Sequence, residues 1–158
     1  MRSALTYLPS AFIPATMTDR ILVPADGSNQ SKTALEYAIA QFPDAEITVL
    51  HVIDPVGGGY ALQRGIPTSG EEWYESAREK ADELFADAQE LAAESDRTLD
   101  TEIEVGRPAR TIVEVADEDD YDGIVMGSHG RSGVSRILLG SVAETVVRRS
   151  TVPVTVVR

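Results

Sequence analysis

Short apolar runs alternate along the chain with segments whose apolar residues recur at helical spacing. Continuous runs such as the one from Ile124 to Met126 are typical of strands buried on both faces of a parallel sheet. The segment from Leu99 to Val105 instead alternates apolar and polar residues, as a strand near a sheet edge does. These patterns predict strands over residues 21–24, 46–53, 99–105, 121–126 and 152–157.

Helical spacing is clearest in the acidic segment from residue 71 to about residue 94. Its predicted core stripe consists of Trp73, Ala77, Ala81, Leu84, Ala88 and Leu91. Other helices are predicted up to about residue 41, over residues 108–118 and over residues 141–150. Because strands and helices alternate throughout, the expected fold is a three-layer α/β sandwich around a parallel sheet.

The composition narrows the class of protein. A length of 158 residues fits one domain, and no apolar run approaches the ~20 residues that a membrane span needs. The chain has no cysteine, which excludes disulfides and thiolate metal sites, and its two histidines, His51 and His129, argue against a multi-histidine zinc site.

Residues 1–17 differ in pattern from the remainder of the chain and predict an extension, either flexible or due to a start assigned upstream of Met17. One domain is expected over residues 18–158.

The charge is strongly acidic but unevenly distributed. The formal net charge is −12, and Lys32 and Lys80 are the only lysines, a balance that fits either a plain acidic surface or, as we favour, adaptation to high salt. From Gly127 onward the sequence contains five arginines and one acidic residue, Glu144, so this segment has a net charge of +4 and the remaining residues have a net charge of −16. This asymmetry predicts a small anionic ligand and argues against nucleic acid.

The glycine pattern near the C-terminus predicts where such an anion binds. Gly127 and Gly130 follow the strand that ends at Met126, and Gly140-Ser141 comes nine residues later, where a helix should begin. Glycine lets backbone N–H groups approach an anion, and the helix N-terminus adds partial positive charge. The pattern therefore predicts a phosphate-binding loop, although Gly140-Ser141 alone would also fit an ordinary loop and helix cap.

Three further stretches carry a family resemblance together with this motif: Val23 to Ser28, Leu50 to Asp54 and Val152 to Val157. Residues 19–158 resemble the nucleotide-binding branch of the universal stress protein family. The resemblance implies a Rossmann-like, doubly wound five-stranded parallel sheet of order 3-2-1-4-5, similar to that of adenine nucleotide alpha hydrolases. It also implies ATP as ligand, a homodimer through the strand Val152–Val157, and a cytoplasmic regulatory or stress-response role.

The resemblance also implies site residues, in the crevice beyond the carboxyl ends of the strands where the sheet order reverses. Val52 would present its backbone to adenine, and Asp26 would contact the nucleoside or a Mg²⁺ ion brought by the phosphates. Asp26 would equally suit a turn and helix cap, and Ala25 stands where some members have threonine. The implied set is Pro24, Ala25, Asp26, Val52, Met126, Gly127, His129, Gly130, Arg131, Gly140, Ser141, Val142 and Ala143.

No residue is predicted to be catalytic. Ser128-His129 suggests a hydrolase, but neighbouring residues on one loop rarely point at each other, and no acid can be placed beside His129. ATP hydrolysis needs a positioned water and charge stabilisation, and the chain has no Walker-type lysine. We therefore expect a module that holds ATP. The alternatives are a slow ATPase or phosphotransferase, and a nucleotide-free dimeric interaction protein.

Overall fold

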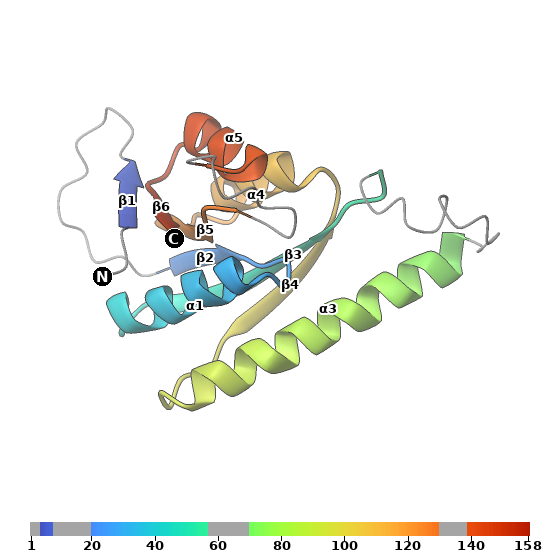
Figure 1. The fold of residues 1–158 in the computed structure, drawn as a ribbon, viewed down its shortest axis with the longest axis horizontal. Helices are drawn as coiled ribbons and strands as arrows, with labels where there is room; N and C mark the ends of the chain where they lie inside the picture. Colours follow the sequence, from blue (N-terminus) through green and yellow to red (C-terminus); the bar gives the residue numbers. More distant parts are fainter. Residues whose placement is uncertain (1–3, 8–19, 57–69, 130–138) are drawn as a thin grey trace.

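Six strands form one sheet with helices on both of its faces (Figure 1). The computed structural model describes residues 4–7, 20–56, 70–129 and 139–158. In chain order the elements are β1 (Ala4–Tyr7), β2 (Arg20–Pro24), α1 (Asn29–Gln41), β3 (Glu46–Ile53), α3 (Gly70–Ala93), β4 (Asp100–Val105), α4 (Pro108–Glu118), β5 (Gly123–Gly127), α5 (Ser141–Arg149) and β6 (Val154–Val157).

The sheet has the order β1-β6-β5-β2-β3-β4. Strands β2 to β6 are parallel to one another and form the predicted 3-2-1-4-5 arrangement, which is confirmed. Strand β4 lies at an edge, as its alternating pattern predicted. Strand β1 was not predicted. It pairs antiparallel with β6, from Ala4 opposite Val157 to Tyr7 opposite Val154, so β6 is not the outermost strand.

Alternate side chains of the central strands fill two separate cores. Val23 and Val49 belong to the core under α1 and α3, whereas Leu22 and Leu50 belong to the core under α4 and α5. Figure 1 shows these two helix pairs on opposite faces of the sheet. Because both faces are covered, the strands need apolar residues at consecutive positions, and this produced the continuous runs in the sequence.

Helix α3 contributes to the core only through its second half. Its buried residues are Ala81, Phe85, Ala88 and Ala92, whereas Trp73 and Ala77, both predicted in the core stripe, are only partly buried. The helix is about 36 Å long and the eight residues of β3 span about 26 Å, so its first turns extend past the sheet (Figure 1). Among the described helices, α3 included, none combines the length and apolar character that crossing a bilayer requires.

Candidate functional site

The strand order reverses between β2 and β5, and we call the region beyond the carboxyl ends of these two strands the crevice. From β2 the chain proceeds to β3 and β4 on one side, while β5 leads to β6 on the other. The segments that follow Pro24 and Gly127 therefore lie at the same edge of the sheet, which is where ligands bind in doubly wound folds.

The backbone of Ala25 is fixed by two hydrogen bonds. Its N–H donates to the carbonyl of Leu50 at 2.8 Å, and its own carbonyl lies 2.8 Å from Nδ1 of His51. Because a carbonyl only accepts, Nδ1 of His51 must carry the proton and donate. His51, which the sequence analysis did not include in the site, thus positions the turn that follows β2.

Asp26 forms the first part of that turn. Its Oδ1 accepts a hydrogen bond from the Ser28 N–H at 2.9 Å, and Gly27 has a φ of 80°, a left-handed conformation that favours glycine. Ser28 then caps α1, its Oγ accepting from the Ser31 N–H at 3.2 Å. The structure therefore shows the turn role considered for Asp26, with its side chain held against the Ser28 N–H at the end of β2.

Val52 presents its peptide groups toward the crevice. In a strand the N–H and C=O of one residue point to the same side, and those of successive residues point to opposite sides. The Leu50 carbonyl faces β2, where it accepts from Ala25, and the Ile53 carbonyl faces β4, where it accepts from Gly106 at 3.0 Å. Val52, two residues after Leu50, therefore faces the β2 side.

No residue of β2 lies opposite Val52. The pairing of β2 with β3 ends at Pro24 and Leu50, whereas the pairing of β3 with β4 continues to Ile53 and Val105. Strand β2 has already turned toward α1 at this level. The result is one donor and one acceptor, adjacent on a rigid strand, with no strand beside them.

Gly127 ends β5 directly against the first turn of α1. A Cβ at this position would lie 2.8 Å from both the carbonyl carbon and the Cβ of Gln30, and 2.9 Å from the Gln30 oxygen. Real Cβ atoms do not approach so closely, so the packing of α1 on β5 requires glycine here. The sequence pattern predicted that Gly127 takes part in phosphate binding. The packing of α1 on β5 is a second reason for glycine at this position, and it is sufficient without a ligand.

Two hydrogen bonds tie the segment after β5 to its surroundings. The Ser128 N–H donates to the Val157 carbonyl at 2.9 Å, and the Gly140 N–H donates to the Ser128 carbonyl at 2.7 Å. A Cβ on Gly140 would lie 3.2 Å from that same carbonyl oxygen. Gly140 thus joins the start of α5 to the end of β5, and its N–H is already used within the protein.

Ser128 and His129 are closer than we expected. Ser128 Oγ lies 3.1 Å from His129 Nδ1, so the argument that these neighbours would not point at each other is wrong. Ser128 is nevertheless only 3% exposed and cannot reach a substrate as a nucleophile. His129 Nε2 is buried and has no hydrogen-bond partner within the described part of the chain.

The N-terminus of α5 offers hydrogen-bond donors. Gly140 is the N-cap and has no side chain to satisfy the first N–H groups of the helix, which belong to Ser141, Val142 and Ala143. Glu144, the acid in the first turn, is paired with Arg148 at 2.5 Å, which offsets its charge. Uncapped amide groups and the positive end of the helix dipole suit a phosphate.

The structure thus places most of the predicted residues around one crevice. Pro24, Ala25, Asp26 and Val52 lie on the β2–β3 side, while Met126, Gly127, His129 and the start of α5 lie on the β5 side. Met126 is buried in the core, so only its backbone can take part. The predictions for Gly130 and Arg131 fall outside the described residues. His51 and Gln30 were not predicted as site residues, and the only signal for His51 was a polar residue within an apolar run.

The residues at the crevice suit a metal ion only in part. Among the described residues, no group of three or more histidine, aspartate or glutamate side chains comes together as a ligand set. Asp26 is the one carboxylate of the predicted site. A magnesium ion here would therefore share its ligands between Asp26, the phosphates and water, as magnesium does in other nucleotide sites.

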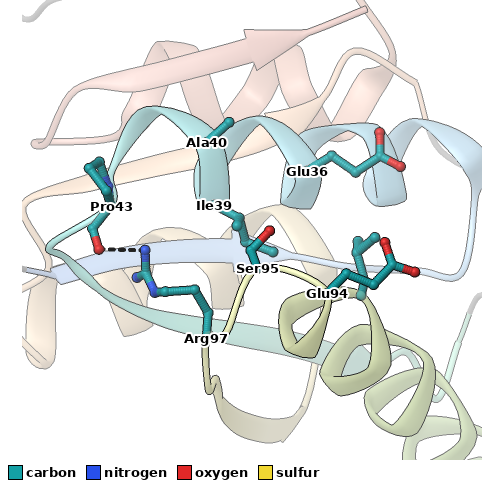
Figure 2. A pocket seen from close by; sticks show the side chains of 8 residues that line it. Glu36, Ile39, Ala40, Pro43, Glu94, Ser95 and Arg97 are labelled. Carbon is teal, nitrogen blue, oxygen red and sulfur yellow. Dashed lines mark hydrogen bonds between the residues drawn. The ribbon is translucent and has the colours of Figure 1, made fainter.

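A second hollow, of about 550 Å³, lies between the C-terminal halves of α1 and α3, near the amino ends of the strands (Figure 2). Arg97 closes one end, donating to the carbonyls of Phe42 at 3.1 Å and of Pro43 and Ala45 at 2.6 Å. Glu36 and Glu94 also line it, and their charges would repel phosphate. This hollow is therefore a poor candidate for a phosphate site.

Comparison with known proteins agrees with the geometry. The model of the universal stress protein family matches residues 17–158. A curated relative, universal stress protein MJ0531 of Methanocaldococcus jannaschii, is 38% identical over 144 residues, covering 88% of this chain and 81% of that protein.

Solved structures show the same fold. Protein MJ0577 of M. jannaschii, 31% identical to this chain, superposes with a TM-score of 0.76 over 90% of this chain and 96% of its own. A universal stress protein solved in complex with cAMP is 26% identical and superposes with a TM-score of 0.65, covering 90% of this chain and 99% of its own.

Proposed function

Because the chain belongs to the universal stress protein family, we propose that it is a cytoplasmic ATP-binding module that regulates a stress response. The observation that carries the proposal is the pairing of two features along one crevice. The uncovered peptide of Val52 suits a base, and the uncapped start of α5 suits phosphates. The +4 charge of the C-terminal segment, in a chain of net charge −12, supports an anionic ligand at this end.

The direction of the Val52 peptide favours adenine over guanine. The edge of adenine offers an amino donor beside a ring-nitrogen acceptor, which complements one N–H and one C=O. Guanine held in the same orientation, as phosphates bound at α5 would hold it, has a carbonyl acceptor and a ring N–H donor in the corresponding places. The Val52 C=O would then face an acceptor and the Val52 N–H a donor. We expect ATP to bind at least about tenfold more tightly than GTP, because mismatched polar groups would be left unpaired.

The direct test is mass spectrometry of the ligand released from protein purified at high salt, repeated on Ser141→Glu. A carboxylate at the first position of α5 competes with phosphate for the helix donors, while its charge favours the helix itself. We expect ATP affinity to fall at least about tenfold, or 1.4 kcal/mol, with an unchanged melting temperature. Ser141→Gln is the matched neutral control and should retain ATP.

Equal ATP retention by Ser141→Glu, Ser141→Gln and the unmodified chain would end the proposal for α5. A Gly140→Val variant would be a poor test, since its side chain would collide with the Ser128 carbonyl and His129 whether or not a ligand binds. Asp26→Asn tests the metal separately. It keeps the oxygen that accepts from Ser28 and removes the charge, so Mg²⁺ should strengthen ATP binding less than it does in the unmodified chain.

A second candidate ligand is a cyclic or monophosphate adenosine nucleotide, favoured by the relative solved with cAMP. The base site would be the same, and only the number of phosphates at α5 would differ. Isothermal titration with ATP, AMP and cAMP decides between them, since a site that uses several phosphates binds ATP most tightly. Release of ADP from bound ATP would instead favour the slow ATPase.

We further infer that the strand Val152–Val157 can pair with its copy in a homodimer, and that the chain is adapted to high salt. The scarcity of lysine and the net charge of −12 support the second inference. A melting temperature that falls steadily as salt is removed would support it, and a melting temperature independent of salt would exclude it.

A further inference from the structure

The outer edge of β6 is occupied by a strand from the N-terminal extension. β1 lies antiparallel to β6 along the whole length of that strand, with Leu5 opposite Val156 and Thr6 opposite Thr155. Figure 1 shows β1 at the end of the sheet beside β6, close to both chain termini. The edge through which a dimer would form is therefore already paired.

The orientation of β1 is the one that a second copy would adopt. Two identical strands related by a twofold axis pair antiparallel across their shared edge. A second β6 laid on the same register would place its Val157 opposite Val154 and its Val156 opposite Thr155. Once β1 leaves, the N–H and C=O groups along this edge of β6 lose their partners, on a strand of three valines and one threonine.

We propose that β1 is a displaceable cap, which competes with β6 of a second copy of this chain for the same edge and so controls dimerisation. This inference rests on the proposed dimer through β6. In the capped state the chain is a monomer, and a partner chain or a change that draws β1 away exposes the dimerisation edge.

The chain geometry allows β1 to act as a tethered competitor. The segment 8–19 can reach about 40 Å when extended, whereas β1 and β2 are three strand spacings, or about 14 Å, apart. A short tether gives the strand an effective concentration of about 1 mM. At micromolar protein the cap therefore prevails unless β6 binds its copy about 1,000-fold better than it binds β1.

Loss of β1 leaves the remainder of the fold intact. Among the residues whose burial is described, every member of the two cores lies at position 21 or later. The five parallel strands keep all of their mutual pairings without β1. A chain that begins at Met17 is therefore expected to fold and to present β6 as a free edge.

The experiment compares molar mass by sedimentation velocity from about 1 to 100 µM, the range in which tethered and free strands compete. The full chain is compared with a chain that begins at Met17 and with full-length Leu5→Pro, which removes an N–H from β1 without shortening the protein. Because the chain has no cysteine, Thr6→Cys with Thr155→Cys gives a lock in which one disulfide holds β1 on β6 of its own chain.

We expect the mass of one chain for the full-length protein and for the oxidised lock, and twice that mass for the shortened chain and for Leu5→Pro. Single-chain mass for all four proteins would refute the dimer through β6 and the cap with it. Dimers of the full-length and shortened chains, with a monomeric lock, would leave the dimer standing and refute the cap. A dimeric lock, or a disulfide between chains, would also refute the cap.

Discussion

Replacement of Gly127 by alanine tests whether this glycine serves packing independently of any ligand. The new Cβ would lie 2.8–2.9 Å from three atoms of Gln30, two of which belong to its backbone. No change of side-chain rotamer moves a backbone atom, so either α1 shifts away from β5 or the end of β5 bends. Overpacking of this kind costs about 1–3 kcal/mol. At about 2–4 °C per kcal/mol, the melting temperature should fall by about 2–12 °C.

The assay is thermal unfolding followed by circular dichroism at high salt, with bound nucleotide first removed. Gly70→Ala is the matched control, because a Cβ at Gly70 meets no atom within 4 Å and alanine favours the start of α3. We expect Gly70→Ala to leave the melting temperature unchanged or slightly raised. If Gly127→Ala and the unmodified chain have the same melting temperature in the absence of nucleotide, the packing argument is wrong and this glycine serves the ligand alone.

Three further predictions concern single side chains. Arg97→Ala should lower the free energy of unfolding, measured in urea, by about 2–3 kcal/mol, since three carbonyls lose a charged donor. Arg97→Lys should recover less than half of this loss, because an ammonium group lacks the guanidinium fork. Full recovery of the stability by lysine would contradict the role of the fork. Burial, with repulsion from Asp119 and Glu104, raises the pKa of Glu102, so its ionisation opposes folding. Glu102→Gln should therefore raise the melting temperature at about pH 7, and this gain should disappear as the pH falls through the carboxyl pKa. A gain that persists at about pH 3 would show that the ionisation of Glu102 is not its cause. His51→Leu should weaken ATP binding several-fold by releasing the Ala25 carbonyl. His51→Asn keeps a hydrogen-bond donor and should retain most of the ATP affinity. Equal losses of affinity in the two variants would show that the hydrogen bond to the Ala25 carbonyl is unimportant.

The sequence predicted the central sheet well because each buried strand has an unmistakable apolar run. Residues 21–24, 46–53 and 121–126 reappear as β2, β3 and β5 within two residues at each end. The order of the parallel strands came from the family resemblance and is confirmed. Helix α3 was predicted with nearly correct ends, but its core stripe was extended too far, because a periodic pattern does not show where the sheet beneath it stops.

Other features depend on which segments meet, and local patterns do not encode this. Ala4–Tyr7 has no pattern that identifies its partner, and its place beside β6 follows only from the assembled sheet. The close approach of Gln30 to Gly127 joins the start of a helix to the end of a strand that lies far along the chain. His51 is one polar residue in an apolar run, and its role appears only when the Ala25 carbonyl is found beside it.

The groups proposed to bind the nucleotide are chiefly peptide groups, so binding depends on the course of the backbone more than on particular side chains. The proposed base site at Val52 depends on β2 ending its pairing with β3 before β4 does, and the proposed phosphate site at α5 depends on a glycine N-cap. Neither feature requires a particular functional side chain. Ala25 illustrates the consequence, because its N–H and its carbonyl are both bonded within the protein. A threonine there would add a hydroxyl to the crevice but would replace no existing contact, so alanine is compatible with nucleotide binding. In the proposed site, selectivity would rest on the direction of the Val52 peptide, and the strand register that sets this direction is itself fixed by the two apolar cores.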